Sequence, residues 1–277
     1  MLWVLICVPE CVSGFPLLGH PADWNGPQLG LMRQRGLACI GIHHYRKYCQ
    51  QALTVPNHPS WMFWLDDQGL GVREIHVQAP QPVRVDFVDA TLQWRIRHGG
   101  GFGEMLARAC RIRPNEPIRI CDATAGWCQD TSLLLSLGAE VWLCERSTWM
   151  QWLIEDGILR AAHDPEHRCT WLGQLHWTAM SALHWLPSVG RGACDVVYLD
   201  PMYPDRQRQA RPSKAMAVLH QMLPDDLEQE PELLTSARQV AKQRVVVKRP
   251  RHAPFMAEIQ PHHQVLGQSS RFDIYLP

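Results

Sequence analysis

Residues 117–277 alternate short apolar runs with longer segments of helical periodicity, and no other feature restricts the possible fold as strongly. Strands are expected at 118–122, 140–145, 171–176, 194–199, 244–248, 264–267 and 271–276. Helices are expected at 130–137, 148–162, 178–186, 213–223 and 231–242. Such alternation is typical of βαβ units, in which helices cover both faces of a parallel sheet. The pattern therefore predicts an α/β fold with a Rossmann-like, doubly wound, mostly parallel sheet.

The earlier part of the chain has a different composition. Residues 1–82 are rich in Pro, Gly, Trp and His, and predict a small N-terminal α+β appendage to a main domain at 83–277. Trp61–Leu65 is one of its short apolar runs, and the apolar run Met1–Val8 is expected to be a buried strand. At the start of the main domain we expect a short strand at Val83–Phe87, a loop at the glycine-rich residues 99–103, and a helix over 104–112.

Composition excludes several classes of protein. The 277 residues carry 27 basic and 27 acidic side chains, so any nucleic-acid contact must be a local patch. The ten cysteines form no CxxC pair and no metal-type spacing, so we expect reduced thiols and no metal; Cys7 and Cys11 are expected to be structural. No apolar run reaches the roughly 18 residues of a membrane span. These observations favour a cytoplasmic protein that binds no membrane.

Acidic residues end two of the expected strands beside a loop of small residues. The run Asp122-Ala123-Thr124-Ala125-Gly126 follows the first strand, and Glu145 ends the second. Small residues let a cofactor approach the backbone, and the next helix offers free N–H groups. An acid after the second strand suits ribose hydroxyls. An ordinary βαβ unit without ligand would share the loop, but the two acids favour a nucleotide-type cofactor, which we predict to be S-adenosylmethionine.

A third acid begins a stiff turn after an apolar strand. Asp200-Pro201-Met202-Tyr203-Pro204 follows the run 196–199. An exocyclic amine of a nucleobase is a poor nucleophile, and a carboxylate with a prolyl carbonyl could accept its two protons while an aromatic face holds the base. We therefore predict catalytic roles for Asp200, Pro201 and Tyr203 in methyl transfer to an amine. Asp200 is also expected to border the cofactor.

With these residues in place, the chain resembles the RsmJ family of bacterial ribosomal RNA methyltransferases, which act on guanine N2 of the small-subunit 16S rRNA. The resemblance covers roughly residues 83–277. It rests on runs that occur in the family's order, namely Val85-Asp86-Phe87-Val88, His98-Gly99-Gly100-Gly101, Asp122-Ala123-Thr124-Ala125-Gly126, Tyr198-Leu199-Asp200-Pro201-Met202-Tyr203-Pro204, Arg244-Val245-Val246-Val247-Lys248-Arg249-Pro250 and Arg271-Phe272-Asp273-Ile274-Tyr275. It implies a class I S-adenosylmethionine-dependent methyltransferase whose partner is 16S rRNA or the small ribosomal subunit.

The resemblance also implies cofactor positions. The family's Arg-Asp pair falls on Gln129 and Asp130, and its Glu-Arg pair on Glu145 and Arg146. A Ser-Ser pair of the family falls on Thr178-Ala179. The chain departs from the family where Gln129 replaces an arginine, where Thr178-Ala179 keeps one hydroxyl of two, and where Cys128 replaces a glycine. We expect weakened rather than lost contacts at Gln129, because an amide can still form hydrogen bonds.

Basic residues flank both ends of this expected site. Arg95 and Arg97 precede the glycine-rich loop, and Lys248 and Arg249 end the valine-rich strand, so we predict contacts with RNA phosphates there. Three other functions remain open. The chain could methylate DNA adenine or protein glutamine, could be a nicotinamide oxidoreductase, or could be a non-catalytic ribosome-assembly factor that keeps the fold. A binding titration with S-adenosylmethionine and NAD would separate the last two from a methyltransferase.

Overall fold

The computed structural model describes residues 3–6, 38–41, 61–66, 68–76, 78, 80–89, 94–95, 98–163, 172–202, 214–222 and 229–277. The chain folds into two compact units. One comprises residues 1–85 together with 155–160, and the other comprises 86–154 and 161–277. Residues 155–160 lie in the middle of helix α6 (Thr148–His163), so one helix contributes to both units. The sequence-based division after residue 82 stays a prediction.

The smaller unit contains an antiparallel sheet in the order β2-β1-β3-β4. Its strands are β1 (Trp3–Ile6), β2 (Ala38–Gly41), β3 (Trp61–Asp66) and β4 (Gly69–Glu74). Strand β1 confirms the strand expected within Met1–Val8, and β3 contains the apolar run Trp61–Leu65. Cys7 and Cys11 lie outside the described residues.

The strand expected at Val83–Phe87 is wrong. Val83 forms only an isolated bridge with Val72, and the following residues turn away. The Asp86 carboxylate accepts the Val88 amide at 3.0 Å, which closes a local turn. Such a side-chain contact competes with strand pairing, and this explains why an apolar alternating run does not extend a sheet here.

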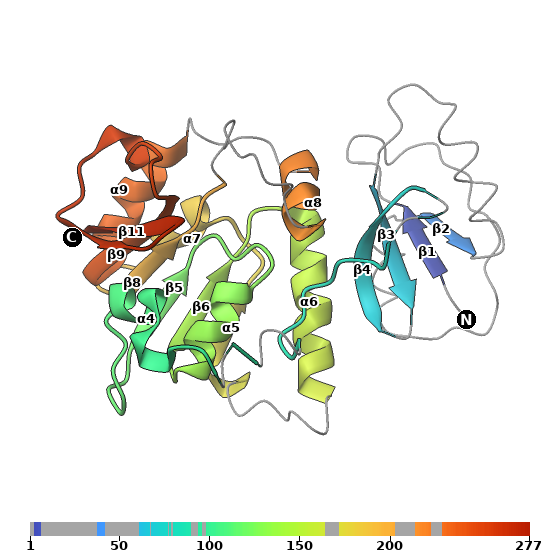
Figure 1. Ribbon diagram of the computed structural model, residues 1–277, viewed down its shortest axis with the longest axis horizontal. Helices are drawn as coiled ribbons and strands as arrows, with labels where there is room; N and C mark the ends of the chain where they lie inside the picture. The colour runs from blue at the N-terminus through green and yellow to red at the C-terminus, as the bar shows by residue number, and fades with distance from the viewer. Residues whose placement is uncertain are drawn as a thin grey trace. The chain divides into compact units, whose positions relative to one another are not determined.

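Within the described part of the larger unit, seven strands form one sheet in the order β10-β11-β9-β8-β5-β6-β7 (Figure 1). The strands are β5 (Arg119–Asp122), β6 (Glu140–Cys144), β7 (Leu175–Thr178), β8 (Cys194–Leu199), β9 (Ala241–Pro250), β10 (His263–Leu266) and β11 (Ser270–Tyr275). The five strands from β9 to β7 are parallel, and β11 is antiparallel to both of its neighbours. The predicted doubly wound, mostly parallel sheet is confirmed.

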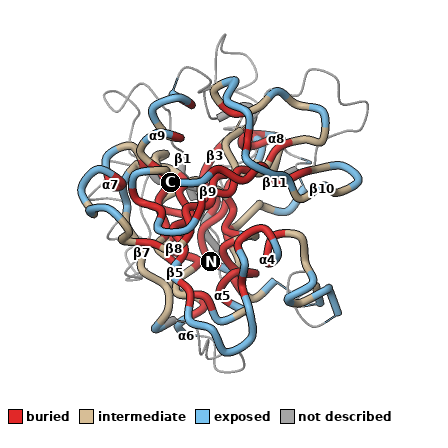
Figure 2. The backbone as a smooth tube through the Cα atoms, turned by 90° about the vertical axis from the view of Figure 1, so that its left-hand side faces the viewer, coloured by how far each residue is buried: buried red, intermediate tan, exposed pale blue. Residues whose placement is uncertain are grey.

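Helices pack on both faces of this sheet because its central strands are apolar on both sides. Val196 and Tyr198 of β8 belong to a core with α4 (Met105–Cys110) and α5 (Gln129–Ser136). The alternate residues Val197 and Leu199 belong to a core with α7 (Ala182–Ser188) and α9 (Glu230–Val240). Successive side chains of a strand point to opposite faces, so one short run supplies both cores. The central strands are accordingly buried along most of their length (Figure 2).

The remaining elements are short. Helix α8 spans Lys214–Met222, and single 3₁₀ turns lie at Gly101–Gly103, Leu172–Gln174 and Met256–Glu258. No helix in the described ranges is long and apolar enough to cross a membrane. Five cysteines of the larger unit have free, buried thiols, namely Cys110, Cys121, Cys128, Cys144 and Cys194.

Two boundaries near β7 differ most from the sequence-based expectation. The strand expected at 171–176 is β7, which begins at Leu175, because pairing with β6 aligns Val141 with Leu175 and Cys144 with Thr178. The helix expected from residue 178 begins at Ala182 instead. The Ser181 hydroxyl accepts the Leu183 amide at 3.3 Å, and this cap marks the start of the helix.

Candidate active site

A cavity of about 430 Å³ opens at the carboxyl ends of β5, β6, β8 and β9. It lies where the strand order changes direction, since β6 follows β5 to one side and β8 lies on the other. Such a switch point is where open α/β sheets bind ligands. The volume is within the usual range of small-molecule sites, roughly 300–1,000 Å³. The topology therefore creates this cavity, and the side chains at the strand ends determine what it can bind.

The buried carboxylate of Asp122 stabilises the loop after β5 through hydrogen bonds. Its Oδ2 accepts the Thr131 hydroxyl at 2.5 Å, and its Oδ1 accepts the Thr124 amide at 3.3 Å. Burial raises the pKa of Asp122 to about 7, against the effect of these two donors. Gly126 and Cys128 both have left-handed backbones, with φ of 49° and 58°. Cys128 thus adopts a conformation that glycine adopts far more readily than other residues.

Glu145, directly after β6, joins the two strand ends. Its Oε2 accepts the Gly126 amide at 3.0 Å and its Oε1 accepts the Ser147 amide at 2.8 Å. Burial raises the pKa of Glu145, although both amides favour the charged form. A carboxylate has about four lone-pair sites, so two remain for a ligand. This arrangement can accept hydrogen bonds from a diol such as that of ribose.

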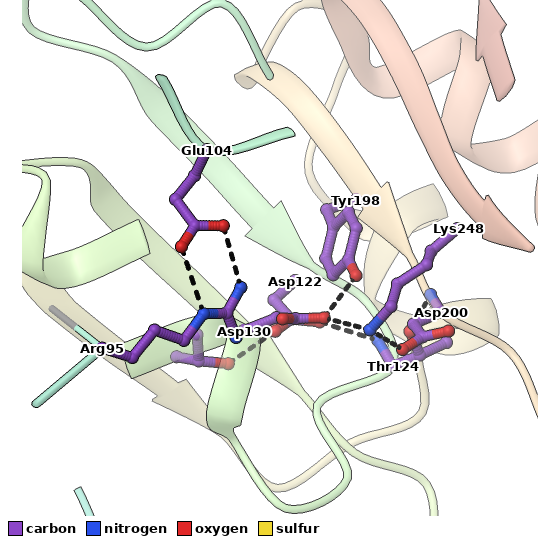
Figure 3. Close-up of polar contacts among 9 residues, drawn as sticks. Arg95, Glu104, Asp122, Thr124, Asp130, Tyr198, Asp200 and Lys248 are labelled. Atoms are coloured by element: carbon purple, nitrogen blue, oxygen red, sulfur yellow. Dashed lines mark hydrogen bonds and ion pairs between the residues drawn. The ribbon is translucent and has the colours of Figure 1, made fainter. Parts of the chain in front are cut away.

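Lys248 connects two carboxylates that line the cavity, one after β8 and one at the start of α5 (Figure 3). Its ammonium lies 2.7 Å from Asp130 Oδ2 and 2.8 Å from Asp200 Oδ2. The Tyr198 hydroxyl donates to the same Asp130 oxygen at 2.6 Å. The Thr124 hydroxyl accepts the Asp200 amide at 2.6 Å, which ties the start of the turn to the cofactor loop.

These contacts set the charges of the network. Burial opposes the charge on Asp130, but Lys248 outweighs it and holds the pKa of Asp130 below its usual value. Burial raises the pKa of Asp200, and nearby Asp130 adds to this rise while Lys248 opposes it. Burial alone would lower the pKa of Lys248, but the two carboxylates together raise it. Lys248 is therefore a fixed cation that favours the charged forms of both neighbouring carboxylates.

The cavity brings together most of the residues predicted for it. It is lined by Asp122, Gly126, Gln129, Asp130, Glu145, Arg146, Asp200 and Pro201. Thr178 and Ala179 do not border it; Ser181, Ala182 and Leu183 do so instead. The displacement follows from the late start of α7, because β7 extends through Thr178. Tyr203 lies outside the described residues.

The basic residues expected to bind RNA lie in different environments. Arg95 forms an ion pair with Glu104 at 3.2 Å and is 41% exposed. Arg249 is only 1% exposed and pairs with Glu230 at 2.6 Å. Its guanidinium is therefore not accessible to an RNA phosphate. Lys248 is engaged by carboxylates inside the cavity, and Arg97 lies outside the described residues.

Sequence reasoning missed the part that Lys248, Tyr198 and Thr124 play inside the site. One signal was available for the lysine. Strand β9 pairs with β8 so that Val247 lies opposite Leu199, and the next residues of the two strands are Lys248 and Asp200. A correct prediction of this register would have placed the two side chains together.

The cavity fits the predicted cofactor. S-adenosylmethionine combines a ribose diol, an amino group, a carboxylate and a cationic sulfur. Glu145 retains acceptor capacity for the diol, Asp130 and Asp200 provide negative charge, and Arg146 provides a cation at the rim. At Gly126 a Cβ atom would meet only the Thr124 carbonyl, at 3.9 Å, so the loop leaves open space. No group of three or more potential metal ligands occurs among the described side chains.

Comparison with known proteins agrees with this geometry. A model of the family described as "Putative SAM-dependent methyltransferase" matches residues 47–277. The ribosomal RNA small subunit methyltransferase J of Pseudomonas paraeruginosa is 38% identical over 91% of this chain and 96% of its own. The protein of that name from Pseudomonas aeruginosa is 42% identical over 80% and 85%, respectively. The crystal structure of a SAM-dependent methyltransferase from Neisseria gonorrhoeae is 31% identical, with a TM-score of 0.63 over 86% of this chain and 93% of its own.

Proposed function

Because the chain belongs to the SAM-dependent methyltransferase family that includes ribosomal RNA small subunit methyltransferase J, we propose that it methylates guanine N2 in 16S rRNA. The observation that carries this proposal is a single cavity that joins Glu145, on the cofactor side, to the Asp200–Pro201 turn, on the acceptor side. The class I fold and the use of S-adenosylmethionine follow from the family itself. The substrate of the homologues would place the reaction in the cytoplasm.

We assign the cofactor to the β5–β6 side of the cavity. Bound S-adenosylmethionine supplies an electrophilic methyl group on a sulfonium. Glu145 would accept the ribose hydroxyls, and Asp122 would hold the loop that carries Gly126. Gln129, Asp130 and Arg146 border the same space. Ser181, which caps the start of α7, is a better candidate for a cofactor contact than Thr178 or Ala179, because it lines the cavity.

The acceptor amine would be held by the turn after β8. The Asp200 carboxylate and the Pro201 carbonyl would accept its two protons, and Tyr203 would stack on the base. Alignment by these groups lowers the barrier because the reacting atoms are held within reach of one another. Lys248 already occupies one oxygen of Asp200, so the amine would use the remaining acceptor sites of the carboxylate. Arg95, which is half exposed, remains a candidate phosphate contact.

Two measurements test the proposal. Small-subunit RNA from a strain lacking this protein should lack one N2-methylguanine, and the purified enzyme should restore it. Asp200→Ala should abolish single-turnover transfer while leaving the fold intact, whereas Asp195→Ala, at the other end of β8, should not. Tyr203→Ala should weaken RNA binding by on the order of 1–3 kcal/mol, because the stacking contact is lost, and Tyr203→Phe should weaken it much less. Transfer by Asp200→Ala at the wild-type rate would refute its assignment.

A further inference from the structure

Trp94 and His98 form an exposed aromatic stack. Their ring centroids lie 5.2 Å apart with an interplanar angle of 23°. Trp94 is 63% exposed, although an indole is among the side chains with most to gain from burial. His98 is exposed as well. The two stacked rings therefore present a flat aromatic surface to solvent.

The backbone holds this stack in place. The Gly99 amide donates to the Arg95 carbonyl at 2.6 Å, and a His98 ring nitrogen lies 3.2 Å from the Trp94 carbonyl. A Cβ atom at Gly99 would lie 2.3 Å from the Arg95 carbonyl oxygen, so only glycine can end this turn. The first glycine of the glycine-rich loop thus fixes one turn that places both rings on the same side.

A second Trp–His pair shows what a structural stack looks like in this protein. The rings of Trp142 and His176 lie 4.4 Å apart at 17°. Both residues are partly buried on paired strands, and His176 forms a hydrogen bond with Glu140 at 2.8 Å. That pair packs across β6 and the edge strand β7. In the Trp94–His98 stack, by contrast, Trp94 is largely exposed to solvent and His98 is exposed as well.

The segment that carries the exposed stack is rich in positive charge, and this favours a polyanion as its partner. Residues 94–113 contain five arginines and a single acid, Glu104, in a chain whose formal net charge is zero. Glu104 is already paired with Arg95. Arg108, Arg111 and Arg113 are exposed, and Arg113 pairs with Glu116 at 3.4 Å. An exposed aromatic stack within a segment rich in arginine is typical of surfaces that bind single-stranded nucleic acid.

The stack is next in sequence to Arg95, which lies beside the candidate active site. Arg95, the residue after Trp94, is close enough to Asp130 for each charge to shift the pKa of the other. Figure 3 shows the Arg95 guanidinium between Glu104 and the carboxylates of the cavity. Asp130 in turn shares Lys248 with Asp200. A base stacked on Trp94 would therefore belong to the same RNA segment as a guanine held at Asp200.

We infer that Trp94 and His98 form a stacking platform for an unpaired base that flanks the target guanine; this rests on the proposed function. A guanine amine reaches Asp200 only when the RNA around it is unstacked, and an unstacked neighbour leaves its π-face exposed. The platform covers that face, while the arginines of residues 94–113 neutralise the phosphates. The occupant is thus protein-free, single-stranded RNA rather than a ribosomal protein.

The test compares Trp94→Ala, Trp94→Phe and His98→Ala with the matched control His176→Ala, which removes the histidine of the other stack. The probe is protein-free small-subunit RNA from a strain lacking this enzyme. Stacking is worth about 1–3 kcal/mol per base, so Trp94→Ala should weaken RNA binding roughly 5- to 150-fold. Trp94→Phe should lose less than about threefold, and His98→Ala should fall between them. His176→Ala should bind as wild type.

Three further readouts separate stacking from other roles. The affinity for S-adenosylmethionine and the unfolding temperature of Trp94→Ala should match wild type, since the side chain is exposed. The slope of log affinity against log salt should also be unchanged, because no phosphate contact is removed. Wild-type RNA affinity in Trp94→Ala, or a reduced salt slope, would overturn the platform. Weakened binding only to the assembled subunit would also overturn it, by indicating a protein partner. If wild type itself methylates no RNA, the proposed function fails and the platform with it.

Discussion

Replacing Lys248 by methionine should expose the role of the shared cation most directly. Methionine preserves much of the length and volume of the side chain but removes the ammonium that lies 2.7 Å from Asp130 and 2.8 Å from Asp200. Two carboxylates would then face each other across the cavity without a cation between them. Asp130 would retain the Tyr198 hydroxyl, whereas Asp200 would lose its ion-pair partner.

The expected loss of stability follows from the exposure of the three groups. Lys248 is 30% exposed, Asp130 17% and Asp200 39%. Fully exposed pairs contribute about 0–1 kcal/mol, and removing one partner of a fully buried pair costs about 3–5 kcal/mol. This partly buried pair of contacts lies between these limits, so we expect a loss of about 1–3 kcal/mol in the free energy of unfolding. Solvent screening at Asp200 favours the lower half of that interval.

The sign of the pH dependence of the stability loss in Lys248→Met follows from the pKa shifts of Lys248 and Asp130. The pKa of Lys248 is raised, so its contribution is complete below its unfolded value and is lost only in strong alkali. The pKa of Asp130 is lowered, so its contribution is complete above its unfolded value and is lost only in acid. The deficit of Lys248→Met should therefore persist from about pH 5 to pH 9. Loss of the cation should also raise the pKa of Asp200 further, because Asp130 remains beside it.

Two assays check this prediction against Lys242→Met, an exposed lysine on the same strand. In urea unfolding at pH 7.5, Lys248→Met should lose about 1–3 kcal/mol and Lys242→Met no more than about 0.5 kcal/mol. In single-turnover methyl transfer, the acid limb of the rate profile should move to higher pH in Lys248→Met alone. Equal stability of the two variants would refute the shared ion pair. An unshifted acid limb would refute the requirement for ionised Asp200.

Three further outcomes are expected. Glu145→Ala should weaken S-adenosylmethionine binding by on the order of 1–3 kcal/mol in calorimetry, because charge-assisted hydrogen bonds to the ribose are lost; unchanged affinity would remove Glu145 from the site. Gln129→Arg introduces, at an exposed position on the cavity rim, the arginine expected there from the sequence resemblance, and it should tighten binding of cofactor or RNA by up to about 1 kcal/mol; a clear loss in the same titrations would show that the loop is adapted to glutamine. Burial raises the pKa of Asp122 to about 7, so wild type should lose stability as pH rises from 4 through 7, by at most about 1.4 kcal/mol per pH unit. Asp122→Asn should lose this component of the slope in urea unfolding at pH 5, 6 and 7.5, and identical slopes would contradict the assigned protonation.

Much of the fold could be predicted because the signals are local. The periodicities of 2 and 3.6 residues reflect which faces of a strand or helix are buried, and they marked β5, β6, β8 and β9 within a few residues. The acids at 122, 145 and 200 follow the ends of parallel strands, and such ends meet at one edge of a sheet. Their convergence on one cavity is therefore a consequence of the order of elements along the chain.

Boundaries in the segment around β7 could not be predicted in the same way. The register with β6 decides that β7 ends at Thr178, and the Ser181 cap then decides where α7 begins. Neither the strand pairing nor the cap geometry is encoded in the local apolar pattern. This is why Ser181 rather than Thr178 reaches the cavity.

The adjacent pair Lys248 and Arg249 separates what the sequence determined from what only the tertiary structure decided. By sequence they are two basic residues at the end of one strand, and both were equally plausible phosphate contacts. In the structure Lys248 joins Asp130, 118 positions away, to Asp200, while Arg249 is buried against Glu230. Successive residues of a strand point to opposite faces, and only the packing of α9 and the register of β8 determine which face holds the carboxylates. Local pattern thus determined the strand and the charge, whereas long-range pairing determined which of the two charges belongs to the site.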